Sequence, residues 1–300
     1  MARENALNIF INDNDKDKLA EIYGEVIEAI QTEAISEQIK NKNYSGDINA
    51  GSVEIDRFKN ATVDDLGTAR TSGEGKALKN TGKVTINVDT DKEIVEELAK
   101  KDVKLYGITG MAEKRKVNHK KRMIAYLDTE FFNCAVTEGT EITVSENTIE
   151  ETIEALIQDV QTTVNDWVDG VDRDMLVLTL KPSVYGKLKN YIDNIDGSNG
   201  NEKLFHDVRV FSNHRQTADA ICMIDGAIGQ PVITDEYDAE KIPLSNDIAL
   251  ELFFSKGTKA VMADLIKYID TVILNTVSTN VVITNTTTNP VNTKEVTVAG

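Results

Sequence analysis

Residue types that do chemistry are present in this sequence, but few of them have the spacing that catalysis requires. Residues 73–76 read Gly-Glu-Gly-Lys, which is similar to the end of a phosphate-binding loop. Arg70, however, stands where that motif needs glycine, and Ala77 stands where it needs serine or threonine. The glycine pattern of a dinucleotide site, the serine elbow of hydrolases and the His-Glu-x-x-His zinc motif do not occur. The sequence therefore offers no motif for phosphate, nucleotide or zinc chemistry.

The titratable side chains form no catalytic constellation either. His206 and His214 flank a predicted strand with no cysteine nearby, and His119 lies in a basic run, so exposed or strand-end histidines are favoured over a metal site. An acidic cluster that follows another predicted strand has the residue types for acid–base work, but an exposed acidic loop is the simpler interpretation. This cluster comprises Asp235, Glu236, Asp238 and Glu240. We predict no catalytic residue, no metal site and no cofactor, and thus a protein that is not an enzyme.

Composition and charge narrow the class of protein further. The chain has 300 residues, of which 40% are hydrophobic and 28% charged, so it should bury a sizeable core in one irregular domain or two lobes. Its net charge of −17 opposes tight, sequence-specific binding of nucleic acid. No apolar run reaches the roughly 18 residues of a membrane span, so we expect a soluble protein, made in the cytoplasm, with no membrane partner. Cys134 and Cys222 are expected to be reduced thiols in or near the core.

The first part of the chain predicts helix and then a projecting arm. From residue 13 to residue 42, apolar side chains recur every three or four positions, which predicts one amphipathic helix or two in tandem. Residues 51–83 are rich in glycine and basic residues and have almost no large apolar side chain after Leu66. They predict either a projecting β-hairpin or a functional loop, without an interior of its own in either case, and residues 83–88 are predicted to form the returning strand. We expect only contact with a sister subunit to fix the shape of this arm.

A long basic helix is predicted next, over residues 109–132, after a short strand over residues 103–106. One side of the helix is apolar, and the others carry the densest basic run of the chain: Lys114, Arg115, Lys116, His119, Lys120, Lys121 and Arg122. One interpretation is a solvated face that pairs with the acidic excess elsewhere. The other is a surface that faces acidic neighbouring subunits or packaged phosphate.

The rest of the chain predicts an α/β lobe followed by returning strands. Helices over residues 146–168 and from Pro182 onward alternate with strands over residues 175–180, 208–211, 220–224 and 232–233. Residues 248–254 and 260–274 are apolar and strand-like. Residues 278–300 are rich in Thr, Val and Asn and form either a frayed end or, as Val281 to Ile283 favour, a β-extension that pairs with another element.

This order of elements resembles that of the Hong Kong 97-like major capsid proteins of tailed phages, over roughly residues 40–275. Local segments agree: residues 84–102 (VTINVDTDKEIVEELAKKD), 175–188 (MLVLTLKPSVYGKL), 226–233 and 249–273. The resemblance implies an α+β fold with an N-terminal arm (residues 1–50), an extended loop (51–90) and a peripheral domain that contains the spine helix (91–140 and 248–277). An α/β apical domain (141–247) and a C-terminal β extension (278–300) complete it.

The resemblance implies a major capsid protein of the virion that forms hexamers and pentamers around a double-stranded DNA genome. Expected partners are further copies of itself, a scaffolding protein, a portal and DNA bound without sequence specificity on the inner face. Expected interface residues in the extended loop are Arg57, Arg70, Glu74, Lys76, Lys79 and Lys83, and those on the basic face of the spine helix are Lys114, Arg115, Lys116, Lys120, Lys121 and Arg122. The alternatives are an encapsulin-like nanocompartment shell and a soluble α/β enzyme. Covalent crosslinking through the loop lysines is not predicted.

Overall fold

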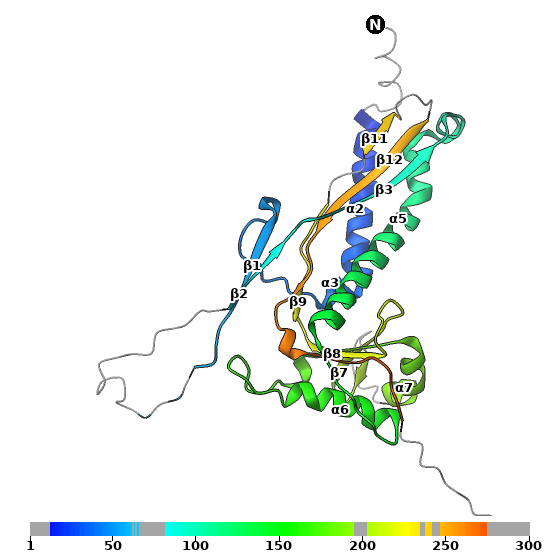
Figure 1. Ribbon diagram of the computed structural model, residues 1–300. Helices are drawn as coiled ribbons and strands as arrows, with labels where there is room; N and C mark the ends of the chain where they lie inside the picture. The colour runs from blue at the N-terminus through cyan, green and yellow to red at the C-terminus, as the bar shows by residue number, and fades with distance from the viewer. Residues whose placement is uncertain are drawn as a thin grey trace, which may run out of the picture.

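The computed structural model describes residues 13–61, 63, 65, 82–194, 203–234, 238–241 and 247–274. Two long helices lie alongside an antiparallel sheet, a hairpin projects to one side of them, and a lobe of helices and strands covers one end (Figure 1). We call the helices and their sheet the spine layer, the projecting element the hairpin, and the remaining unit the lobe. This is the mixed helix-and-sheet architecture that the sequence predicts, in the predicted order.

The helices of the spine layer are α2 (Asp13–Glu33), α3 (Ile35–Ile39) and α5 (Lys100–Glu138). Two helices in tandem, the second of the predicted alternatives, are confirmed at the N-terminal end, since Ala34 between α2 and α3 is extended (φ −75°, ψ 129°). The strand predicted over residues 103–106 is wrong, because these residues are helical. At Gly107 the backbone is not helical (φ 73°), and this break divides α5 into a short first stretch and a long second one. The first stretch is too short to show a clear helical periodicity in the sequence.

The sheet of the spine layer is antiparallel, and its longest partners are β12 (Ile248–Lys256) and β3 (Thr90–Leu98). The shorter strands β10 (Val232–Thr234) and β11 (Asp238–Lys241) also pair with β12. The inner face of the sheet packs on α2 and α5 through Leu98, Leu250, Leu252 and Phe254, among others. The predicted acidic loop is wrong for Asp238 and Glu240, which lie in β11 because β12 offers a hydrogen-bonding edge; Asp235 and Glu236 lie outside the described residues.

The lobe consists of a six-stranded mixed sheet covered by α6 (Ile149–Gln161) and α7 (Pro182–Asn194). Its strands, in sheet order, are β4 (Thr140–Glu141), β14 (Ile266–Ile269), β8 (Ala220–Ile224), β5 (Leu176–Leu180), β7 (Val208–Ser212) and β6 (Leu204–Phe205). Every residue of the central strand β5 is buried, as its uninterrupted apolar run requires. A capping box of Thr148 and Glu151 starts α6, so the helix begins three residues later than predicted.

Short elements and buried polar contacts join the lobe to the spine layer. They include β9 (Ile228–Gly229), β13 (Lys259–Ala260) and the 3-10 turn at Ala263–Leu265. Two further 3-10 turns lie elsewhere, at Ile48–Ala50 before β1 and at Arg173–Met175 before β5. Asp128 of α5 is fully buried and accepts hydrogen bonds from the Ser36 backbone N (3.0 Å), the Ser36 hydroxyl (2.8 Å) and the Arg215 guanidinium (2.6 Å). One carboxylate therefore ties α3 and a lobe loop to the spine helix.

Candidate subunit interface

The projecting hairpin consists of β1 (Ser52–Arg57) and β2 (Gly82–Asn87), paired antiparallel with Ser52 opposite Asn87. It extends away from both the spine layer and the lobe (Figure 1). Val53, Ile55 and Ile86 are buried together with Val261, which follows β13, so the cluster is shared between the hairpin and the body. Beyond the end of β1, Phe58 is 51% exposed and Val63 is fully exposed.

The end of β1 is anchored to the body by Arg57. Its guanidinium donates two parallel hydrogen bonds to the Asp264 carboxylate (2.7 and 2.8 Å), which also accepts one from the Asn165 amide (2.6 Å). Burial alone would raise the pKa of Asp264, but these hydrogen bonds and the positive charge of Arg57 outweigh it, so the pKa lies below its ordinary value. The carboxylate stays ionised at neutral pH and holds the hairpin in place.

Trp167 completes the anchor on the lobe side. Arg57 and Lys59 lie 5.2 and 5.3 Å from the centre of its ring, which is the geometry of cation–π contacts. Gly82 lies against the same ring, so close that an added Cβ would come within 2.7 Å of it. The Lys59 ammonium also pairs with Asp166 at 2.6 Å. The expectation that only a sister subunit could fix the arm is therefore wrong for its base, which the same chain orders.

The remaining loop residues predicted for the interface divide into two groups. Lys83 lies on the exposed side of β2 and pairs with Glu54 of β1 at 2.6 Å, and this hydrogen bond raises the pKa of Lys83. The others lie outside the described residues: Arg70, Glu74, Lys76 and Lys79. The structure thus places Arg57 at the anchor and Lys83 on the hairpin surface.

The basic face of α5 is largely paired within the chain. Lys116 pairs with Glu25 of α2, and Lys120 with Glu33 of α2 at 2.8 Å. Arg115 binds Glu96 of β3, and these hydrogen bonds, more than the burial that opposes them, lower the pKa of Glu96. The solvated-face interpretation, in which the basic run pairs with the acidic excess elsewhere, matches these contacts.

The other basic residues of α5 are more exposed. Lys114 stacks its ammonium on the Tyr106 ring, 3.1 Å from the ring centre. Lys121 and Arg122 are exposed on the helix surface. His119, which belongs to the same run, is fully buried and faces Glu96 across 3.1 Å, a burial that its polar neighbours in sequence did not indicate. Only the exposed part of the run remains for contact with a partner.

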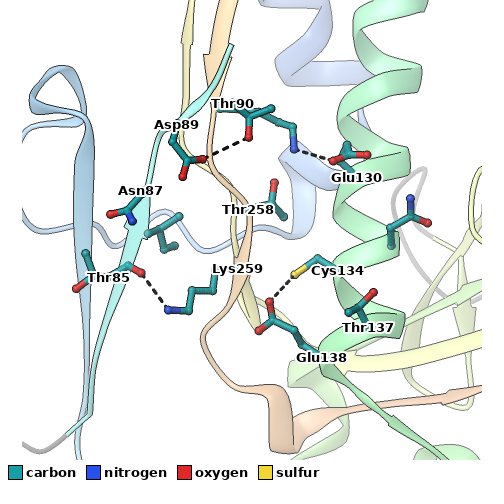
Figure 2. Close-up of a pocket in the computed structure, with 13 residues that line it drawn as sticks. Thr85, Asn87, Asp89, Thr90, Glu130, Cys134, Thr137, Glu138, Thr258 and Lys259 are labelled. Atoms are coloured by element: carbon teal, nitrogen blue, oxygen red, sulfur yellow. Dashed lines mark hydrogen bonds and ion pairs between the residues drawn. The ribbon is translucent and has the colours of Figure 1, made fainter. Parts of the chain in front are cut away.

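A groove beside the hairpin was not predicted from the sequence. It has a volume of about 440 Å³ and lies between β2, the C-terminal half of α5 and the loop that joins β12 to β13 (Figure 2). Its walls are polar, with Thr85 and Asn87 on β2, Glu130 and Glu138 on α5, and Lys259. No local pattern marks this groove, because its walls come from three separate segments. We call it the β2 groove.

Two side chains that line the β2 groove are paired with carboxylates. Burial, reinforced by the charge of Glu138, raises the pKa of the Cys134 thiol to about 12, so the thiol is protonated and donates to Glu138 (3.5 Å). A protonated thiol is a poor nucleophile. Lys256 is buried and pairs with Glu130 at 2.9 Å.

The prediction of two free thiols in or near the core is confirmed, with Cys134 partly and Cys222 fully buried.

The two histidines of the lobe have different surroundings. His206 lies in the β6–β7 turn and pairs with Glu154 at 2.9 Å, whereas His214 is exposed after β7. Within the described ranges, no group of three or more His, Cys, Asp or Glu side chains is arranged to hold a metal ion. Nor does any described helix have the length and apolar character needed to cross a membrane.

Solved structures share this fold over most of the chain. A chain from Mycobacterium phage Che8 is 15% identical and aligns over 79% of this chain and 91% of its own length, with a TM-score of 0.58. The virus-like particle of Pyrococcus furiosus (9% identity, 83% and 97% covered, TM-score 0.55) and the capsid of cyanophage P-SCSP1u (13%, 79% and 87%, 0.53) are also similar. No protein-family model and no curated protein matches the chain. The chain therefore has the fold of tailed-phage major capsid proteins, the Hong Kong 97-like fold expected from the sequence.

Proposed function

We propose that this chain is a major capsid protein that self-assembles through hexamers and pentamers into the icosahedral shell of a tailed phage. The observation that carries the proposal is the fold, which matches capsid structures over about four fifths of the chain. A subunit with a projecting hairpin and a separate lobe suits assembly, because each can reach a different neighbour. The protein would be made in the host cytoplasm and incorporated into the virion.

The described elements support the proposed division of the chain. The extended loop (residues 51–90) corresponds to the hairpin, and the peripheral domain (91–140 and 248–277) to α5 with its sheet. Most of the proposed apical domain (141–247) forms the body of the lobe, to which β14 adds a strand from residues 266–269. The end of that range differs, because β10 and β11 pair with β12 in the spine layer. Residues 1–50 and 278–300 would be the N-terminal arm and a C-terminal β extension.

The proposed partners are further copies of the chain, a scaffolding protein, a portal and double-stranded DNA. Contact with DNA would be local and non-specific, since the net charge of −17 repels phosphate. Lys114, Lys121 and Arg122 are the residues of the basic run best placed for it, because Arg115, Lys116 and Lys120 pair within the subunit. In the loop, we propose that the segment with Arg70, Glu74, Lys76 and Lys79 docks on a neighbouring subunit.

A nanocompartment shell, which encloses protein cargo, is the second candidate. The observation that favours it is the likeness to the virus-like particle of Pyrococcus furiosus, 97% of whose chain is covered. The two candidates share the fold and differ in contents.

Electron microscopy of the purified full-length chain tests the shared part of the proposal. We expect closed particles, and a monodisperse monomer under all assembly conditions would overturn both candidates. The ratio of absorbance at 260 and 280 nm of particles from infected or expressing cells then separates a nucleic-acid-filled capsid from a protein-filled compartment. Deletion of residues 68–81, which spares Gly82 and its contact with Trp167, should leave a folded subunit that forms no closed shell. A control is the substitution Thr32→Ala, which changes an exposed side chain of α2 outside the proposed contacts.

A further inference from the structure

The hairpin presents one covered and one open edge. The edge of β1 is covered, because Ser45 and Glu54 exchange two backbone hydrogen bonds of 2.8 and 2.9 Å. β2 pairs with β1 alone among the described strands. An edge strand with unpaired backbone groups is a template for a further strand. The open side of β2 is therefore a candidate for docking an extended segment.

Hydrogen bonding identifies which groups of β2 point to the open side. The Val88 N–H donates to the Gly51 carbonyl (2.8 Å), and in an antiparallel pair the hydrogen-bonded positions alternate with outward-pointing ones. Lys83, Thr85 and Asn87 thus direct their backbone groups away from β1. The Lys259 ammonium confirms this direction, since it donates to the Thr85 carbonyl at 3.3 Å. Gly257 lies against the Asn87 carbonyl, so the part of this edge that is open is Lys83 to Thr85. The Thr85 N–H has no partner among the residues described.

The open edge forms one wall of the β2 groove. Figure 2 shows Thr85 and Asn87 on one side, with Cys134, Thr137 and Glu138 of α5 facing them across the cavity. Acidic and basic groups nearly balance in the walls, and two of them, Glu130 and Lys256, neutralise each other. A polar groove with little net charge beside an open strand edge suits an uncharged, polar, extended segment. A strongly charged peptide or an apolar helix would fit it less well.

The chain itself contains such a segment. Residues 275–293 include no charged side chain, and residues 281–289 read Val-Val-Ile-Thr-Asn-Thr-Thr-Thr-Asn, which is rich in the β-branched residues that favour strands. At about 3.3 Å per residue, the residues that follow Leu274 span up to roughly 85 Å when extended. Leu274 packs against the core of the lobe, and the chain segment that follows β14 runs across the lobe away from the hairpin (Figure 1). This direction favours a neighbouring subunit as the acceptor.

We propose that residues 278–289 of a second copy of this chain add a third strand to the open edge of β2, within the β2 groove. The inference rests on the proposed self-assembly and names one contact that would carry it. The docked strand accepts from the Thr85 N–H, takes the place of Lys259 at the Thr85 carbonyl and lays its threonine hydroxyls against the polar wall of α5. The hairpin then becomes part of a three-stranded sheet, which is more stable than a two-stranded one.

Disulfide trapping in the full-length chain tests the contact directly. In a Cys134→Ala background, which removes the thiol in the groove, a Thr85→Cys subunit is mixed with subunits that carry one cysteine in the tail: Asn280→Cys, Val282→Cys, Thr284→Cys, Thr286→Cys or Thr288→Cys. We expect a mixed dimer on a non-reducing gel for some of these pairs and none when Thr32→Cys, exposed on α2, replaces Thr85→Cys. No dimer at any tail position would overturn the proposal. A crosslink found only within a doubly substituted chain would overturn the choice of a second copy.

A backbone substitution provides the second readout. Thr85→Pro removes the outward N–H and leaves the β1–β2 hydrogen bonds in place, whereas Thr85→Val keeps the N–H. Lys294 is the only tryptic site after Leu274. The rate at which trypsin cleaves there therefore reports whether the segment after Leu274 is bound. We expect cleavage to accelerate roughly tenfold in Thr85→Pro, which corresponds to about 1.4 kcal/mol of lost binding, and to stay unchanged in Thr85→Val. Equal rates in both variants would contradict the docked strand. If shells form without the crosslink, only this inference fails; if the crosslink forms without shells, the proposed function fails.

Discussion

The hairpin and the lobe bury their apolar side chains in different ways. In the lobe, α6 and α7 cover a sheet whose central strand β5 is buried along its whole length. In the hairpin, Val53, Ile55 and Ile86 are buried, and Val261 of the body completes the cluster. The lobe therefore has the interior of a folding unit, whereas the hairpin takes its order from the surface on which it rests. On the proposed function, the lobe would supply the rigid body of a subunit, and the hairpin would supply the element that reaches a neighbour.

The joint between the lobe and the spine layer should show the largest effect. Asp128→Ala leaves the Arg215 guanidinium without its buried partner and removes two hydrogen bonds from Ser36. Loss of one partner of a buried ion pair costs about 3–5 kcal/mol, so the urea midpoint should fall strongly. Removal of the exposed pair through Lys83→Ala should leave the urea midpoint almost unchanged, because exposed ion pairs contribute little to stability. Similar losses in the two variants would contradict the distinction between body and hairpin.

Alanine substitutions of buried side chains sharpen the comparison between the lobe and the hairpin. Leu178→Ala in β5 should lower the global free energy of unfolding by about 2–5 kcal/mol, because the side chain is fully buried on a rigid strand. Val53→Ala removes an equally buried side chain, but we expect the hairpin to open locally before the body unfolds. Hydrogen exchange should then accelerate in β1 and β2 alone. A matching loss of global stability in Val53→Ala would show that the hairpin and the body unfold together.

Close packing under β2 gives a smaller effect. A Cβ added at Gly257 would lie 2.1 Å from the Asn87 carbonyl oxygen, so Gly257→Ala must displace either β2 or its own loop, at a cost of about 1–3 kcal/mol. Gly24→Ala is the matched control, since nothing lies within 4 Å of the added atom and alanine favours the helix. Differential scanning calorimetry should show a lower transition for Gly257→Ala and an equal or higher one for Gly24→Ala. Equal transitions would mean that β2 is not held against this loop.

The anchor of the hairpin should respond to pH with little change in global stability. The pKa of Asp264 is depressed in the folded chain, so its contribution is complete above the ordinary carboxyl value of about 3.9 and is lost as the pH falls through the lower folded value. Trp167, the single tryptophan of the chain, lies at this anchor and reports on it by fluorescence. We expect constant emission from pH 7 to about pH 5 and a red shift only below about pH 4.

Substitution of the anchor separates this effect from acid unfolding. Arg57→Ala should give the red-shifted emission at pH 7, where the body remains folded by circular dichroism. Arg122→Ala, on the exposed face of α5, should leave the emission unchanged. If Arg57→Ala emits like the unsubstituted chain, Arg57 does not hold the hairpin.

Local patterns predicted the elements well where one face or one strand is uniformly buried. The apolar run of β5 and the alternation in β2 each gave the right element, because burial fixes their periodicity. The strand predicted over residues 103–106 was wrong because the helical stretch that ends at Gly107 is too short to show a helical repeat of apolar residues. The order of elements identified the fold, since it depends on the whole chain and not on any one segment.

Contacts between distant residues could not be predicted in the same way. Arg57 meets Asp264 across 207 positions, and Lys116 meets Glu25 across 91. Nothing in the local sequence of either partner specifies the other, because an ion pair requires only two side chains of opposite charge that the fold brings close together. The anchor of the hairpin, the neutralised face of α5 and the β2 groove therefore became visible only with the fold.

The pairing of α5 with α2 has a consequence for how a genome would be held. Since Lys116 and Lys120 already face Glu25 and Glu33, the wall of a shell built from this subunit would offer phosphate few fixed positive charges. Mobile cations and polyamines would then have to neutralise the enclosed DNA. Contacts between the DNA and the wall would do little to lower the pressure of the DNA. On the proposed function, a genome held by so few fixed charges could leave the shell without first being detached from its wall.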